Sequence, residues 1–314
     1  MQIANRQRRS FNNQRANLQQ DEIMIICDFK ENIKLGGGPK EINQDFYHRS
    51  QCSVFGCAVI YVDPELKKPK VIYTDYLSDV LSHDGVFVRD CIAHLISKLS
   101  SICPRLETFN KINFWTDVGL HFRCQEVAHF LLVEIPTIFN VEVAWNTFAE
   151  CHGKSIVDGH FGLLSRWVQQ IETKEKVTSI ELLIKLLNKK LMNSNINKNF
   201  NNQLINKFFC YQQNGRPETY KKLLIPNITN FYCFQANFSE NKENIIVRIK
   251  MLTDSSIYQE DVYGKMKIKE VSETRKTKFG SKVTESANLK KICSDEVVYG
   301  ANTKRRLQVQ YQYL

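Results

Sequence analysis

Three aspartates stand where the sequence would place a strand end or a helix start. Asp28 follows the apolar, β-branched run Ile23–Cys27, which is typical of a short buried strand. Asp117 ends a second such segment, KINFWTD, and Asp158 lies 41 residues later, just before an amphipathic stretch. The pattern predicts that distant parts of the chain each deliver one carboxylate. Taken alone, each aspartate could equally be a solvated strand-end residue or a helix cap.

Clustered carboxylates suit phosphoryl transfer on nucleic acid. Such a reaction needs an activated water or 3′-hydroxyl and a stabilised leaving oxygen, and two Mg²⁺ or Mn²⁺ ions about 3.5 to 4 Å apart can provide both. Hard divalent cations prefer oxygen ligands, which carboxylates supply. Three carboxylates at one point would repel one another without a metal. The sequence therefore predicts a Mg²⁺ or Mn²⁺ site, if the three aspartates meet.

The secondary-structure pattern gives the elements that would bring them together. Three strands, mostly antiparallel, are expected at residues 22–33, 53–62 and 70–77, followed by a helix over 82–99 with Ser82 or Asp84 as its N-cap. A strand then ends at Asp117, a helix spans about 122–132 and stops before Pro136, and 141–148 forms an edge strand. A last helix begins near Asp158.

The resulting order is β-β-β-α-β-α-β-α. This is the order of the ribonuclease H-like fold, an α/β fold with a mixed five-stranded sheet flanked by helices. In that fold, acids from the first strand, the fourth strand and the last helix converge on one spot. The expected fold class is therefore α/β, ribonuclease H-like, with a basic C-terminal extension.

Three short motifs also resemble those of eukaryotic DDE/DDD cut-and-paste DNA transposases. The family's DFSEN-like, FSDG-like and HGKG-x-x-DG-like motifs correspond to DFKEN at 28–32, FWTDV at 114–118 and HGKSIVDG at 152–159. The resemblance covers about residues 22–170. The motifs are short, but their order and spacing together are fairly specific.

The resemblance implies that Asp28, Asp117 and Asp158 are the catalytic metal ligands. It also implies that His152 and Lys154 lie beside the third acid, with Lys154 near a phosphate. His152, Lys154 and Arg166, the last on the outer side of the final helix, are the candidates for DNA contact. The sequence departs from the family at two positions, since Lys30 replaces a small polar residue and Val118 replaces a glycine. Val118 could crowd the approach of DNA.

Two alternatives to this ligand set remain open. Glu150 lies 33 residues after Asp117, close to the spacing common among integrases, and is a rival third acid. A zinc site from His121, Cys124, Cys151 and His152 is also conceivable, although the spacing does not match a standard zinc finger.

Charge is unevenly distributed along the chain. Residues 1–172 carry 18 basic and 20 acidic side chains, whereas residues 173–314 carry 25 and 13. We expect a polar basic arm at 1–20, a catalytic domain at 21–172, a helical linker at 173–207 and a basic, partly β region at 208–314 that ends in an extended tail. The basic excess suits binding to DNA, and a solvated lysine-rich tail would account for the same composition.

Composition narrows the class of protein. No run of about 18 apolar residues suggests a membrane span, no apolar segment follows the basic N-terminus, and the ten scattered cysteines fit a reducing compartment. We expect a nuclear or cytoplasmic protein that acts on transposon-end DNA, with a homodimer as the usual assembly of the resembled class. The alternatives are an inactive, truncated or domesticated transposase that binds DNA or other partners, and another ribonuclease H-like nuclease.

Overall fold

The structure is a computed structural model. It describes residues 2–37, 49–103, 106, 108–149, 155–196, 198, 203–214, 221–240, 244–264, 280–285 and 298–299. Within these residues, no helix combines the length and apolar character needed to cross a bilayer. All eight cysteines that fall in the described part of the chain are free thiols, and seven of them are buried.

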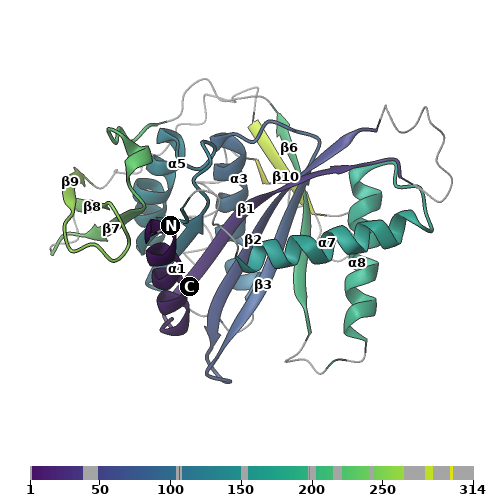
Figure 1. The fold of residues 1–314 in the computed structure, drawn as a ribbon, viewed down its shortest axis with the longest axis horizontal. Helices are drawn as coiled ribbons and strands as arrows, with labels where there is room; N and C mark the ends of the chain where they lie inside the picture. Colours follow the sequence, from purple (N-terminus) through teal and green to yellow (C-terminus); the bar gives the residue numbers. More distant parts are fainter. Residues whose placement is uncertain are drawn as a thin grey trace.

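Five strands form the centre of one mixed sheet (Figure 1). They are β1 (Glu22–Lys34), β2 (Gln51–Asp63), β3 (Lys68–Ser78), β4 (Lys111–Thr116) and β5 (Glu142–Thr147). β2 pairs antiparallel with both β1 and β3, while β4 runs parallel to β1 and β5 runs parallel to β4. The prediction of an α/β protein with a mixed sheet flanked by helices is confirmed.

The sheet is larger than the predicted five strands, and β5 is not an edge strand. Strands from the C-terminal region add to both sides, giving the order β11-β10-β6-β3-β2-β1-β4-β5-β7-β8-β9 among the described residues. The added strands are β6 (Ile205–Asn214), β7 (Cys233–Phe238), β8 (Asn244–Lys250), β9 (Gln259–Gly264), β10 (Gly280–Glu285) and β11 (Val298–Tyr299). The physical reason is that β3 and β5 would otherwise expose unpaired backbone groups, which β6 and β7 cover.

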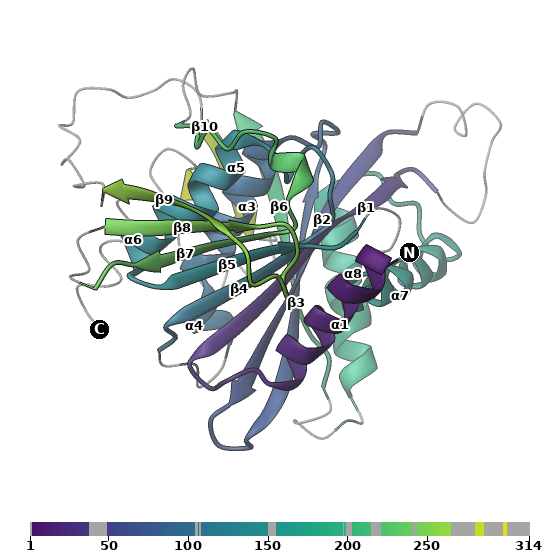
Figure 2. The same cartoon turned by 60° about the vertical axis from the view of Figure 1, so that its left-hand side comes forward.

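Helices cover both faces of the sheet (Figure 2). One face packs against α3 (Gly85–Ser97), α4 (Leu99–Ile102), α5 (Gln125–His129), the π-helical turn η1 (Phe130–Glu134) and α6 (Ile135–Phe139). The other face packs against α1 (Gln2–Ala16), α7 (Ile156–Glu172) and α8 (Ile180–Asn195). A 3₁₀ turn, η3 (Ile228–Asn230), precedes β7. Alternating residues of β1 enter the two cores in turn, as the period of a strand requires.

One prediction about the helices is confirmed and another is wrong. Asp84 is the N-cap of α3, because its carboxylate accepts a hydrogen bond from the backbone N–H of Phe87 at 3.0 Å. The helix expected to stop before Pro136 instead continues through it, as α5, η1 and α6 follow one another without a break. Pro136, which has no N–H to donate, is the second residue of α6, and the π-helical turn lies directly before it.

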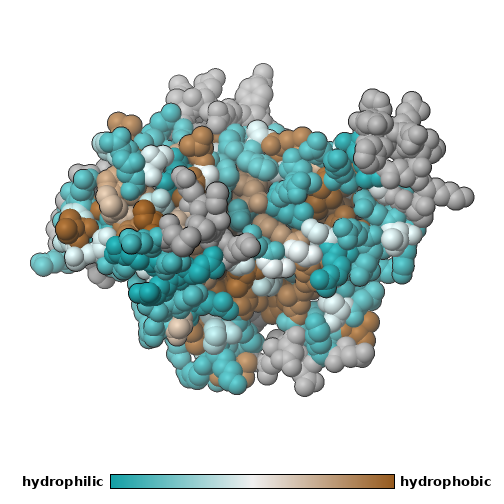
Figure 3. All heavy atoms as spheres, viewed as in Figure 1, coloured by the Kyte–Doolittle hydropathy of each residue, from teal (hydrophilic) through white to brown (hydrophobic). Residues whose placement is uncertain are grey.

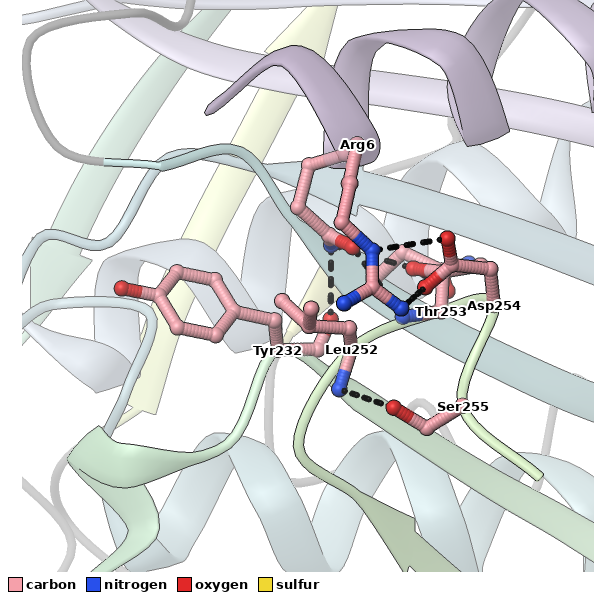
Figure 4. Close-up of polar contacts among 8 residues, drawn as sticks. Arg6, Tyr232, Leu252, Thr253, Asp254 and Ser255 are labelled. Atoms are coloured by element: carbon pink, nitrogen blue, oxygen red, sulfur yellow. Dashed lines mark hydrogen bonds and ion pairs between the residues drawn. The ribbon is translucent and has the colours of Figure 1, made fainter. Parts of the chain in front are cut away.

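The N-terminal segment expected as a polar arm forms helix α1 and packs on the sheet. Gln7 is fully buried, and its amide donates to the carbonyl of Thr147 at 2.9 Å and the hydroxyl of Thr253 at 3.0 Å. Arg6 forms an ion pair with Asp254 at 2.7 Å (Figure 4). These contacts join α1 to the end of β5 and to the loop after β8.

The face that carries α7 is mixed in character. In the view of Figure 1, hydrophilic residues cover much of the surface and hydrophobic residues lie between them (Figure 3). The predicted apolar side of α7 is buried, with Phe161, Leu164, Val168 and Ile171 all less than a tenth exposed. Arg166 is exposed, as expected for the opposite side of the helix.

Candidate functional site

The register of two parallel strands places Asp28 and Asp117 side by side. The pairing of β1 with β4 runs to Cys27 opposite Thr116, and the next residue in each case is an aspartate: Asp28 within β1, and Asp117 just past the end of β4. Neighbouring strands lie about 4.8 Å apart. Because side chains alternate along β1, Asp28 points to the face that α7 covers, the same face as Met24 and Ile26. Two of the predicted acids are thus neighbours.

Helix α7 brings Asp158 to the same region, and Gly56 allows its close approach. Gly56 pairs directly with Asp28 across β1 and β2. A Cβ atom at Gly56 would lie 2.4 Å from the ring of Phe161, which is one turn further along α7 than Asp158. Only a glycine leaves room for the helix at this point. Helix α7 therefore passes over the sheet beside Asp28.

Asp158 itself is held by a capping box at the start of α7. The backbone N–H of Ser155 donates to Asp158 Oδ2 at 2.6 Å, and the N–H of Val157 donates to Ser155 Oγ at 3.2 Å. This arrangement is the helix-cap alternative named above. It orients the carboxylate while engaging one of its two oxygens in the bond to Ser155.

The charges of Asp117 and Asp158 act on Asp28. Burial, together with the negative charges of Asp117 and Asp158, raises the pKa of Asp28 to about 7, against a hydrogen bond from the Phe29 N–H that lowers it. That bond is 2.8 Å long and reaches Asp28 Oδ1. A repulsion from both other aspartates requires that the carboxylates lie near one another. The three predicted acids are therefore brought to one region of the molecule.

Carboxylates are suitable ligands for a divalent cation, but these three side chains are not close enough together to ligate one metal ion. Carboxylate oxygens are the ligands that Mg²⁺ and Mn²⁺ prefer, and a bound cation would offset the repulsion that raises the pKa of Asp28. Across the described ranges, no three His, Cys, Asp or Glu side chains are close enough together to ligate a metal ion. The charges of Asp117 and Asp158 thus act on Asp28, but the three carboxylates are too far apart to ligate one metal ion together.

Asp117 is supported by a tight turn and a histidine. The N–H of Gly119 donates to Asp117 Oδ1 at 2.9 Å, and His121 Nε2 lies 3.6 Å from the same oxygen. A Cβ at Gly119 would lie 2.4 Å from the imidazole of His121 and 3.0 Å from Asp117 Oδ1. The glycine that the turn needs is therefore Gly119, one residue after Val118.

A pocket of about 260 Å³ adjoins this turn. It is lined by His83, Asp84, Gly85, Val86, Leu120, His121, Cys124 and Glu126. His83 stacks on Phe29 with ring centroids 4.0 Å apart, and His121 meets the same ring edge-on at 4.8 Å. Burial lowers the pKa of both histidines, and at His121 the charge of Asp117 opposes that effect. The pocket therefore presents mainly uncharged imidazoles at neutral pH.

The remaining predicted site residues divide into two groups. Arg166 is described, and its exposed place on α7 leaves it accessible from solvent. Glu150, His152 and Lys154 lie outside the described residues, as does Cys151 of the zinc alternative. No local sequence pattern marks His83, and the sequence indicated His121 only as a ligand of the zinc alternative. The feature that could have found His121 is its spacing of four residues from Asp117, which suits a turn.

A family model described as a domain of unknown function (DUF8701) matches residues 7–249. The match extends from within α1 to within β8, so it includes all three aspartates and the C-terminal strands β6 and β7. No curated protein matches the chain. No solved structure matches it either.

Proposed function

This chain belongs to the family described as a domain of unknown function (DUF8701), and we propose that it is a DNA-acting phosphotransferase of the DDE/DDD transposase kind. The observation that carries the proposal is geometric: Asp28 and Asp117 follow paired residues of two parallel strands, and the helix that begins near Asp158 packs over Gly56, the strand partner of Asp28. Burial and the negative charges of Asp117 and Asp158 raise the pKa of Asp28 to about 7. Carboxylates that repel one another lower the stability of the folded protein. The binding of a cation would explain why such carboxylates from separate elements lie in one region.

The arrangement of the central strands supports the same proposal. The central strands have the order β3-β2-β1-β4-β5, in which β3, β2 and β1 are antiparallel and β1, β4 and β5 are parallel. This order supports the proposal of a ribonuclease H-like sheet. The three aspartates of the resembled motifs lie within β1, directly after β4 and in the first turn of α7, which follows β5. The fold-level analogy raises the expectation of nuclease or strand-transfer chemistry without assigning it.

In this proposal Asp28, Asp117 and Asp158 hold Mg²⁺ or Mn²⁺, and Glu150 remains the rival for the third position. When bound, the metal ions activate a water or 3′-hydroxyl and stabilise the leaving oxygen. The turn at Gly119 and the capping box at Ser155 orient the second and third carboxylates. Lys154, His152 and Arg166 contact the DNA backbone. A homodimer on paired transposon ends and a nuclear location belong to the same proposal.

A second function has two observations in its favour. Asp158 caps its own helix, and no closed metal-ligating group occurs in the described ranges. These facts suit a domesticated copy that has kept the fold and binds DNA without cutting it. Another ribonuclease H-like nuclease, which would hydrolyse DNA without joining strands, uses the same acids and differs only in its products.

The test uses the purified full chain and a duplex that carries the sequences flanking its gene. We expect cleavage or strand transfer with Mn²⁺ or Mg²⁺, no product with a chelator, and loss of product on Asp28→Asn or Asp117→Asn. A comparison of Asp158→Ala with Glu150→Ala shows which of the two residues is the third ligand, because the loss of the true ligand should abolish the product. Metal-independent binding of the duplex by a chain that never cuts it would establish the inert descendant instead.

A further inference from the structure

Directly under α7 lies a buried polar cluster made by three distant residues. His160 Nε2 lies 2.8 Å from Asp75 Oδ2, and the side-chain amide of Asn206 donates to the same oxygen at 2.8 Å. Asp75 is fully buried, and Asn206 and His160 are 3% and 4% exposed. The three residues come from β3, β6 and α7. The cluster therefore ties a helix to two strands of the sheet.

Packing around the cluster leaves His160 little freedom. Its imidazole stacks on Tyr73, also of β3, with ring centroids 4.1 Å apart and planes 11° from parallel. Hydrogen bonds to a buried carboxylate are strong, because water does not compete for them. The loss of either partner would leave the buried Asp75 side chain with one hydrogen bond fewer. These contacts fix the place of α7 on the sheet.

Asp75 of the buried cluster lies in the same row of paired residues across the sheet as Asp28. Asp28 pairs with Gly56, and Gly56 pairs with Asp75, so the three form one row across β1, β2 and β3. Their side-chain positions share the face that α7 covers. His160 binds one end of this row, while Asp158, two residues earlier on α7, is placed near the other end. Gly56 in the middle leaves the space through which the helix approaches.

We propose that Asp75, His160 and Asn206 are positioning residues that hold α7 so that Asp158 faces Asp28 and Asp117. Asn206 lies on β6, beyond the stretch that carries the transposase-like motifs. The C-terminal half of the chain is thus part of the site, because its first strand supplies one of the two donors to Asp75. The consequence for catalysis rests on the proposed function, whereas the hold on α7 does not.

The experiment compares two substitutions of His160 in the full chain. His160→Leu removes the hydrogen bond, and His160→Gln retains an amide that can donate to Asp75. Mn²⁺ affinity is measured from the paramagnetic resonance signal of free Mn²⁺, and amide hydrogen exchange of residues 156–163 is measured without metal. Mutation of a residue that orients a metal ligand without binding the metal itself typically changes metal affinity by about 10- to 100-fold. We therefore expect at least about tenfold weaker Mn²⁺ binding and faster exchange in His160→Leu, with most of both effects reversed in His160→Gln.

The matched control is His94, another buried histidine, which is hydrogen-bonded to Tyr76 on the opposite face of the sheet. His94→Leu should lower stability without changing Mn²⁺ affinity or exchange of residues 156–163. If His160→Leu does not fold, Asn206→Leu provides the same comparison from β6. Unchanged affinity and exchange in a folded cluster variant overturn the proposal. A wild-type chain that binds no Mn²⁺ refutes the proposed function instead, and the exchange measurement still decides whether the cluster holds α7.

Discussion

The raised pKa of Asp28 predicts that Asp28→Asn stabilises the metal-free protein at alkaline pH. The native state holds the Asp28 proton more tightly than the unfolded state does, since burial and the two neighbouring charges raise its pKa from 3.8 to about 7. Below the unfolded pKa the carboxyl is protonated in both states and costs nothing. The cost grows as pH rises from about 4 to 7, and it is constant above that.

The full cost corresponds to a shift of roughly three pH units, or about 4 kcal/mol of unfolding free energy. Asparagine keeps the oxygen that accepts the Phe29 N–H and removes the charge. We therefore expect Asp28→Asn to raise the unfolding free energy by a few kcal/mol at pH 8 and by nearly nothing at pH 3.5. Urea denaturation with a chelator present, over a series of pH values, measures both quantities.

The control for this experiment is Glu31→Gln, an exposed carboxylate on the same strand, which should change stability little at either pH. Mg²⁺ should stabilise the wild-type chain more than Asp28→Asn, because a bound cation stabilises only the folded state. A variant Asp28→Asn that is neutral or destabilising at pH 8 would show that burial and the two neighbouring charges do not raise the pKa of Asp28. The proposed site would then lose its main support.

Three further substitutions test the local geometry. Gly56→Ala places a Cβ 2.4 Å from the ring of Phe161 and should cost about 1 to 3 kcal/mol in denaturant unfolding, whereas Gly159→Ala, with nothing within 4 Å of its Cβ, should be neutral or slightly stabilising. Asp117→Asn removes one repelling charge, so the pH at which Asp28 titrates should fall, as measured by carbon-13 NMR of the labelled side chain. An unchanged midpoint would place Asp117 too far from Asp28 to act on it.

Local patterns were sufficient to predict the central strands and the candidate acids. The apolar run before Asp28 and the similar one before Asp117 are strands, and their parallel register brings the two aspartates together. Asp84 caps α3 as its sequence position indicated. These features depend on a few neighbouring residues, which is why the sequence alone contains them.

Features that depend on distant residues were not predicted. The segment expected as an edge strand is covered by β7, which follows it by about 85 residues and whose own sequence does not specify a partner. His160 and Asp75 are 85 residues apart, and Asn206 is 131 residues from Asp75, so no local spacing marks the cluster. The continuation of the helix through Pro136 depends on a π-helical turn that propensity does not indicate.

The central claim is that carboxylates from β1, β4 and α7 meet to hold divalent cations. A crystal structure of the full chain grown with Mn²⁺, with anomalous data collected for the metal, tests it most directly. We predict anomalous peaks bridged by the oxygens of Asp28, Asp117 and Asp158. Peaks elsewhere only, or three carboxylates that point to separate surfaces, would contradict the account.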